Sequence, residues 1–346
     1  MVWYALLVLI WFPLRGCGQE VVVKRVWDCL SVLTGLKLQV RTPSMQTNDE
    51  RYNSSCFFNV NFNVRRCDLE KTSGVRVLVG STSSLGEKKT TALPSFREIS
   101  MPPITENFTL WIAGDSLIQQ LMVSLACQLE SKLEALVFPV HPSVNATPHH
   151  YCVKGIRGSG IGRMCFYYLG CFTGQCFYPF CPAVNMNATC LEDLYTLVGP
   201  NDTIFVGLGV HIREKEQTTL RAELSHYHTL RPSLLRKTKH LFWLQTAAQH
   251  FSTGTGRLEA GKQKYFLKKP CVPHRANGEG IVNLATAETI LDPIVPLYEV
   301  SAHAYDRHSG LRGKTHDCTH YCNPGVPDAW ADLLGHYLVC GATARF

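Results

Sequence analysis

The sequence predicts an α/β fold, with a mostly parallel sheet covered by helices on both faces. Three apolar runs of strand length support this prediction: FTLWIAGDS at 108–116, DTIFVGLGV at 202–210 and HLFWLQTA at 240–247. Helical patterns alternate with them, at 117–133, where apolar residues recur every three or four positions, and at 327–338. Alternation of buried strands with helices is typical of a parallel sheet that buries both faces.

Length and composition fit a globular protein with a sizeable core. The chain has 346 residues, of which 45% are hydrophobic and 18% are charged. This length predicts one large domain, or one domain with an N-terminal extension. The balance of apolar and charged residues excludes an intrinsically disordered chain.

The N-terminus carries the features of a secretory signal peptide. An apolar run from Val2 to Leu14 is followed by the small residues Gly16 and Gly18. The run is too short for a typical membrane span, so we expect a cleaved signal peptide at 1–18. An uncleaved signal anchor is the alternative, because no charge precedes the run to set its orientation.

Cysteine usage indicates an oxidising compartment. The chain has 15 cysteines, and removal of Cys17 with the signal peptide leaves an even number, as expected for a set of disulfides. The disulfide candidates are Cys29, Cys56, Cys67, Cys127, Cys318 and Cys322. N-glycosylation sequons, which fit the same compartment, occur at Asn53, Asn107, Asn145, Asn187 and Asn201. We expect a protein of the Golgi lumen or the cell exterior, with no stable membrane span after signal cleavage.

Two parts follow the expected signal peptide. Segment 19–105 is irregular, and its cysteines predict a disulfide-stapled extension. Residues 106–346 hold the alternating strands and helices and form the predicted main domain. Within it, the stretch 165–190 is rich in cysteine and aromatic residues. We interpret that stretch as a disulfide-supported insertion, with a sugar-stacking platform as the alternative.

The net charge of +7 is spread along the chain. The densest basic patches lie at 231–240 and 262–269. They are either solvated faces of the protein or surfaces that attract an anionic polymer or a phosphorylated donor. Nucleic acid is not an expected partner in the secretory pathway.

Ser116 is the first candidate for chemistry, because it lies where an apolar strand turns into a helix. At such a turn a hydroxyl reaches the carboxyl edge of a sheet, and the free N–H groups of the helix start can stabilise a negative transition state. The alternative is that Ser116 is the N-cap of the helix, which is a common role for serine at this position.

The stretch HDCTHYCNPGVPDAW at 316–330 supplies the partners that a serine nucleophile needs. His320 would take the proton of Ser116, and Asp317 would orient His320. A loop–helix junction is expected to bring these two together across three positions. A zinc site made of Cys318, His320 and Cys322, with His316, is the alternative, but an oxidising compartment favours the cysteines as disulfide staples, and no metal is expected.

Four stretches resemble the trichome-birefringence-like family, also called the PC-esterase domain, a branch of the SGNH/GDSL hydrolase superfamily. GDSL at 114–117 and DCTHYCNPGVPDAW at 317–330 are similar to its two signature blocks. RYNSSCFF at 51–58 and LFWLQTAAQHF at 241–251 are weaker matches. The resemblance implies an SGNH-hydrolase-like fold with a catalytic domain at 106–346, and a triad of Ser116 as nucleophile, His320 as base and Asp317 as its orienter.

The chain departs from the family pattern at several positions. GDSL is followed by Ile118, Gln119, Gln120 and Leu121 in place of an Arg-Asn-Gln segment, and Tyr321 and Asn323 replace Trp and Leu. The segment 207–211 lacks the asparagine that the family places in the oxyanion hole. The candidates for oxyanion or substrate contacts are Gly158, Gly209 and His211.

The resemblance and the triad residues predict a polysaccharide O-acetyltransferase that works through an acetyl-serine. No bound cofactor is expected. The acetyl donor would be acetyl-coenzyme A or another acetyl carrier, and the acceptor a polysaccharide or other glycan. Two alternatives stay open: an O-acetylesterase in which water accepts the acetyl group, and a catalytically silent carbohydrate-binding protein of the same fold, which the missing asparagine favours.

Overall fold

The computed structural model describes residues 37–40, 75–82, 88–92, 108–129, 133–135, 150–156, 161–170, 172–173, 190–208, 210, 212, 217–253, 256–257, 267–273, 280–312, 315–323 and 325–343. The expected signal peptide lies outside these residues, as does most of segment 19–105, and the predicted domain boundaries stay predictions.

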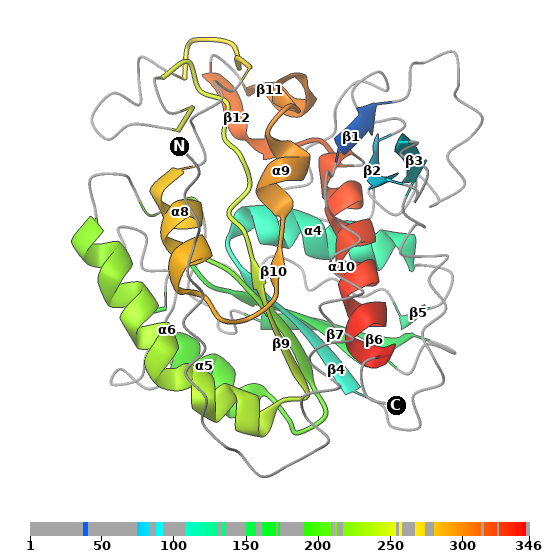
Figure 1. Cartoon of the computed structure of the whole chain (residues 1–346), viewed down its shortest axis with the longest axis vertical. Helices are drawn as coiled ribbons and strands as arrows, with labels where there is room; N and C mark the ends of the chain where they lie inside the picture. Colours follow the sequence, from blue (N-terminus) through cyan, green and yellow to red (C-terminus); the bar gives the residue numbers. More distant parts are fainter. Residues whose placement is uncertain are drawn as a thin grey trace.

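A seven-stranded sheet forms the centre of the protein, in the order β10-β9-β8-β4-β7-β6-β5 (Figure 1). Five strands pair in parallel: β4 (Phe108–Gly114), β7 (Ile161–Tyr168), β8 (Thr203–Val206), β9 (His240–Leu244) and β10 (Ile294–Val295). The strands β6 (His150–Ile156) and β5 (Leu133–Ala135) add an antiparallel edge. The predicted α/β class, SGNH-hydrolase-like with a mostly parallel sheet, is confirmed.

Helices cover both faces of this sheet (Figure 1). They are α4 (Ser116–Gln128), α5 (Cys190–Leu197), α6 (Gln217–Lys237), α8 (Gly280–Thr289), α9 (Leu297–Ser301) and α10 (Val326–Thr343), with a short 3-10 helix η3 (Tyr305–Arg307). The side chains of successive residues in β4 point to opposite faces of the sheet. Leu110 and Ile112 pack in one core cluster with α4 and α10, whereas Trp111 and Ala113 pack in the other with α5, α6 and α8.

The order in which the chain adds strands reverses beside β4. After β4 the chain builds β7 on one side, and it then crosses to build β8 on the other side. The loops that leave the carboxyl ends of β4 and β8 therefore diverge. In open parallel sheets, ligands bind at such a switch point, where the strand order reverses. A ligand site is therefore expected at the edge next to Ser116.

Two smaller sheets complete the described structure. The strands β1 (Lys37–Val40), β2 (Val75–Thr82) and β3 (Lys88–Ala92) form an antiparallel sheet near α10 (Figure 1). The strands β11 (His308–Arg312) and β12 (Thr315–Tyr321) form an antiparallel hairpin that leads into α10. Neither sheet was predicted from the sequence.

Several predicted boundaries change. The helix expected at 117–133 spans 116–128, and the helix expected at 327–338 extends over 326–343. The interpretation of 165–190 as an insertion is wrong at its start, because Cys165 to Tyr168 belong to β7 in the central sheet. Phe166 and Tyr167 face opposite core clusters there, so both faces of this strand are buried. Nothing in the described parts of the chain has the length and hydropathy of a membrane-spanning helix.

Candidate active site

The turn from β4 into α4 presents Ser116 at the carboxyl edge of the sheet. β4 ends at Gly114, and α4 begins two residues later at Ser116. A Cβ atom at Gly114 would lie only 2.4 Å from Cγ1 of Ile118. Glycine is therefore required here so that the strand end can approach the first turn of the helix.

The cap of α4 is Asp115, so the interpretation of Ser116 as the N-cap is wrong. Asp115 Oδ1 accepts the N–H groups of Leu117 at 2.9 Å and Ile118 at 3.5 Å. The helical ladder starts when the N–H of Gln119 donates to the carbonyl oxygen of Asp115. The Ser116 hydroxyl is thus not used for capping. The backbone N–H of Ser116 is bonded neither by the cap nor by the helical ladder, and it lies at the positive end of the helix dipole.

The second oxygen of Asp115 ties this turn to the loop that follows β8. Asp115 Oδ2 accepts the N–H of Val210 at 2.8 Å. The buried guanidinium of Arg257 holds the same loop from its other side, donating to the carbonyl oxygens of Val210 at 3.2 Å and Ile212 at 2.8 Å. The two loops that border the switch point are therefore fixed to one another beside Ser116.

A β-bulge brings Asp317 and His320 together. Residues three apart in a regular strand point to opposite faces of a sheet. The pairs on either side of the register shift in the hairpin are His308 with Tyr321 and Gly310 with Asp317. Two steps along β11 therefore oppose four steps along β12, and the extra length bulges out of the hairpin. The expectation of a loop–helix junction is wrong, since both residues lie within β12.

Within the bulge the backbone folds around the carboxylate of Asp317. Its Oδ1 accepts the N–H groups of Thr319 at 3.1 Å and His320 at 3.0 Å. Two backbone donors on one oxygen fix the orientation of the carboxylate. The bulge therefore orients the carboxylate of Asp317 toward the ring of His320.

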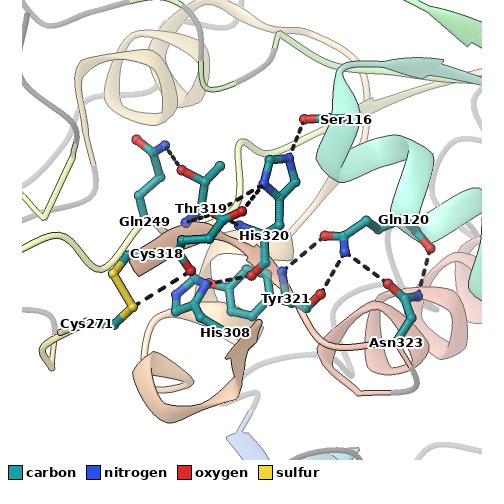
Figure 2. A network of polar contacts seen from close by, with 11 residues as sticks. Ser116, Gln120, Gln249, Cys271, His308, Cys318, Thr319, His320, Tyr321 and Asn323 are labelled. Atoms are coloured by element: carbon teal, nitrogen blue, oxygen red, sulfur yellow. Dashed lines mark hydrogen bonds and ion pairs between the residues drawn. A yellow bond between two sulfur atoms is a disulfide. The ribbon is translucent and has the colours of Figure 1, made fainter. Parts of the chain in front are cut away.

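Ser116, His320 and Asp317 form a continuous hydrogen-bonded arrangement. Figure 2 shows the contact between Ser116 and His320. Ser116 Oγ lies 2.8 Å from Nε2 of His320. Nδ1 of His320 lies 3.0 Å from Oδ2 and 3.2 Å from Oδ1 of Asp317. The side chains of His320 and Asp317 are 18% and 15% exposed, so the arrangement is partly shielded but still open to solvent.

These contacts assign the hydrogen atoms of neutral His320. The ionised carboxylate of Asp317 can only accept a hydrogen bond, so Nδ1 carries the proton. Nε2 is then the acceptor, and it faces the hydroxyl of Ser116. This is the tautomer that can take a proton from Ser116 as the hydroxyl attacks an electrophile.

A buried aromatic layer supports the main chain on either side of His320. The Nδ1 of His308 donates to the carbonyl oxygen of His320 at 3.1 Å, and its ring stacks on Tyr321 with 4.2 Å between centroids. Burial lowers the pKa of His308 well below its ordinary value of 6.5, and the neighbouring ring of His250 lowers it further. The Tyr321 hydroxyl donates to the carbonyl oxygen of Ala248 at 2.7 Å, and burial raises its pKa.

Disulfides hold this region, as the sequence predicted for Cys318. Cys318 is bonded to Cys271, a partner far outside its own turn that the sequence did not single out. Cys322 and Cys127 are also disulfide-bonded. Since Cys318 and Cys322 are both oxidised, they are not thiolate ligands, and the zinc interpretation is wrong for them. A further bridge joins Cys152 to Cys165 between β6 and β7.

Other predicted site residues lie outside the described residues. They are the oxyanion and substrate candidates Gly158, Gly209 and His211, the disulfide candidates Cys29, Cys56 and Cys67, and the sequons at Asn53, Asn107, Asn145 and Asn187. Asn201 is described: it is half-buried in the turn before β8, at the opposite end of the strand from the Ser116 edge.

Sequence reasoning missed the residues that support the site. His250, His308 and Cys271 were not singled out, and Gln120 was noted only as a departure from a family motif. A histidine or glutamine in an apolar segment does not by itself indicate a supporting role. That role depends on contact with a buried partner that is distant in sequence.

The fold and the site define a class: an α/β protein with an SGNH-hydrolase-like sheet and a hydrogen-bonded serine, histidine and aspartate at its carboxyl edge. No protein-family model matches this chain. A stretch of 46 residues is 33% identical to protein trichome birefringence-like 36 of Arabidopsis thaliana. That stretch covers 13% of this chain and 12% of the plant protein, so the match spans about an eighth of the relative's length. The similarity agrees in part with the family resemblance of the sequence motifs.

Proposed function

We propose that the protein is a carbohydrate O-acetyltransferase that transfers an acetyl group through Ser116. The observation that carries the proposal is the 2.8 Å contact between Ser116 Oγ and His320 Nε2, with Asp317 on the other ring nitrogen. A serine hydroxyl becomes a competent nucleophile when a neutral imidazole is placed to take its proton.

In the first half of the reaction the acetyl group moves to the enzyme. Ser116 Oγ attacks the carbonyl carbon of the donor while its proton passes to His320 Nε2. The bond to the donor's leaving group then breaks, and the leaving group takes that proton from His320. Asp317 stabilises the imidazolium between these two steps, and the spare N–H of Ser116 is suited to the transient oxyanion.

In the second half the acetyl group moves to the acceptor. A sugar hydroxyl gives its proton to His320, and its oxygen attacks the acetyl carbonyl carbon. The bond to Ser116 Oγ breaks, and Ser116 recovers the proton from His320. The products are the O-acetylated sugar and the starting enzyme, so atoms and charges balance over the two steps.

Acetyl as the transferred group and a glycan as the acceptor are supported by the motif resemblance and the partial match to a trichome birefringence-like protein. The disulfides fit an oxidising compartment. A signal peptide, N-glycosylation, and residence in the Golgi lumen or outside the cell are further parts of this proposal.

An O-acetylesterase is the second candidate, and the exposure of the site favours it. The side chains of His320 and Asp317 are partly open to solvent, so water can reach the position of the acceptor hydroxyl. Water and a sugar hydroxyl use the same base and the same acyl-enzyme, and the difference lies in how well the acyl-enzyme excludes water.

The test is to follow a labelled acetyl group on the full secreted chain. The protein is incubated with [14C]acetyl-coenzyme A or 4-nitrophenyl [14C]acetate, and then with buffer or a panel of neutral and acidic oligosaccharides. The transferase predicts label on the Ser116 peptide that leaves faster with a matching oligosaccharide, and labelled sugar as product. Label that leaves quickly in buffer and ignores every oligosaccharide identifies the esterase. No label from either donor, together with no reaction with a fluorophosphonate probe, identifies the catalytically silent protein.

A further inference from the structure

We infer that Gln120 and Asn323, which we call the amide pair, are positioning residues that set the alignment of Ser116 with His320. The inference rests on the proposed function, because it assigns these residues a role in a serine-based reaction. Neither side chain touches the reacting atoms. Both are buried, with 3% of Gln120 and 1% of Asn323 exposed.

Gln120 and Ser116 are held in a fixed relative position by α4. The two residues are four positions apart on α4, so their side chains project from the same face of the helix, one turn apart. That face points at the end of β12, which carries His320 (Figure 2). Any shift of α4 that moves Ser116 also moves Gln120.

The amide of Gln120 binds the main chain of the residue that follows His320. Gln120 Nε2 donates to the carbonyl oxygen of Tyr321 at 2.7 Å, and Gln120 Oε1 accepts the N–H of Tyr321 at 3.1 Å. A single side chain thus satisfies both main-chain groups of one residue, as a neighbouring strand does in a sheet. The end of β12 is thereby held to the helix that carries the nucleophile.

Asn323 completes the amide pair. Its Oδ1 accepts the second hydrogen of Gln120 Nε2 at 3.0 Å. Its Nδ2 donates to the carbonyl oxygen of Gln120 at 3.2 Å and to Oγ of Ser124 at 2.8 Å. All four side-chain N–H groups of the two amides are used, and both oxygens accept a bond.

This saturation fixes the orientation of both amides. If Gln120 were flipped, its NH2 group would face the N–H of Tyr321, and two donors would oppose each other in a buried space. The amide pair therefore acts as a rigid link between α4 and β12 rather than as an adjustable contact. A rigid link matters because a displacement of about 1 Å at a catalytic contact costs about 10²-fold in rate.

The amide pair also accounts for two departures of this chain from the family motifs. Gln120 lies in the first departing segment and Asn323 in the second, about two hundred positions apart, and the structure places them in direct contact. They are therefore a matched set. This argues against drift in a silent protein as the reason for these two departures.

The test compares Gln120→Met and Asn323→Leu with a matched control, Gln128→Met. Gln128 lies two turns further along the same helix, is equally buried, and donates to the carbonyl oxygen of Asp328 in α10 at 3.4 Å, away from Ser116. Each substitution replaces an amide side chain with an apolar one of similar length, and Asn323→Leu also keeps the branched shape. Each is assayed well below its own unfolding temperature, with 4-nitrophenyl acetate for kcat and KM, and with a fluorophosphonate probe for the labelling rate of Ser116.

We expect Gln120→Met to lower kcat and the labelling rate by about 10- to 100-fold with little change in KM. Gln128→Met is expected to stay within about twofold of the wild type, even where it lowers the unfolding temperature as much. The double variant Gln120→Met/Asn323→Leu should be little worse than Gln120→Met alone, because the two residues act as a unit. Equal rate losses in Gln120→Met and Gln128→Met would show a purely structural role and overturn the inference.

A spectroscopic readout separates this inference from the proposed function. The imidazole 15N and 1H signals of His320, assigned with Ser116→Ala, report the contact with Ser116 without any substrate. We expect Gln120→Met to shift these signals toward those of Ser116→Ala, and Gln128→Met to leave them at the wild-type position. If the wild type neither hydrolyses the ester nor reacts with the probe, the proposed function fails, while unchanged His320 signals in Gln120→Met would reject the positioning role itself.

Discussion

The Oγ of Ser116 lies 2.8 Å from Nε2 of His320, although 204 positions separate the two residues in the chain. One comes from the first turn of α4 and the other from a bulge in β12. Their contact depends on the parallel sheet that places Ser116 at its carboxyl edge and on the hairpin that folds back over this edge.

Substitution Ser116→Ala should reduce acyl-enzyme formation by about 10³-fold or more, because the proposed nucleophile is removed. The free energy of unfolding should change by less than about 0.5 kcal/mol, since Asp115 and not Ser116 caps the helix. Burst kinetics with 4-nitrophenyl acetate and urea unfolding measure the two quantities. Ser225→Ala, at an exposed position of α6, is the matched control. Full activity in Ser116→Ala would reject both the transferase and the esterase.

Substitution Asp317→Asn should lower kcat by about 10³- to 10⁴-fold without unfolding the bulge. The asparagine oxygen can still accept the N–H groups of Thr319 and His320, but its NH2 group would face Nδ1 of His320. His320 would then carry its proton on Nε2 and could not accept the proton of Ser116. Steady-state kinetics and circular dichroism check this, with Asp306→Asn at an exposed aspartate as control. A loss below about tenfold would show that Asp317 does not control the tautomer.

Removal of the bridge between Cys271 and Cys318 should lower both stability and activity. The bridge closes a loop of 47 residues, so the double variant Cys271→Ala/Cys318→Ala should lose about 4 kcal/mol of unfolding free energy by chain entropy. It should also lower kcat, because Cys318 directly follows Asp317 within the bulge.

The bridge between Cys152 and Cys165 is the matched control for that experiment. It closes a loop of 13 residues between β6 and β7, and its removal should cost about 3 kcal/mol. Cys165 lies opposite Trp111 in the middle of β4 and not at the carboxyl edge that carries Ser116, so the activity of the folded fraction should stay at the wild-type level. Chemical unfolding and the rate per folded molecule are measured for both variants, and a similar loss of rate in both would contradict a specific role for Cys318.

Stability should fall as the pH drops below about 6.5, through His308. Burial lowers the pKa of His308 in the folded protein, whereas in the unfolded chain it titrates near 6.5. Below that pH the unfolded state binds a proton that the folded state does not, so unfolding is favoured by about 1.4 kcal/mol per pH unit. Urea unfolding between pH 5.5 and 7.5 measures the slope, and His308→Gln should flatten it. An unchanged slope in that variant, with His303→Gln as the control for loss of an exposed histidine, would contradict the prediction.

Local pattern in the sequence was sufficient for the central elements. The apolar run before Gly-Asp-Ser predicts β4, and the spacing after it predicts α4, because burial on one or both faces sets a period that needs no distant partner. The end of α4 was misplaced since apolar spacing continues to Leu133 and no Gly or Pro marks a stop near Gln128. The proposal of Ser116, His320 and Asp317 as partners rests on the chemistry that each residue type can perform.

Only the tertiary structure decided how these residues meet. The bulge in β12 arises from its register against β11, and no periodicity within 315–321 reveals that register. The partner of Cys318, the cap at Asp115 in place of Ser116, and the contact of Gln120 with Asn323 each depend on segments that approach in space from far apart in the chain. Sequence pattern indicates which face of a segment is buried, but it does not indicate which other segment packs against that face. The alignment of Ser116 with His320 depends on that packing.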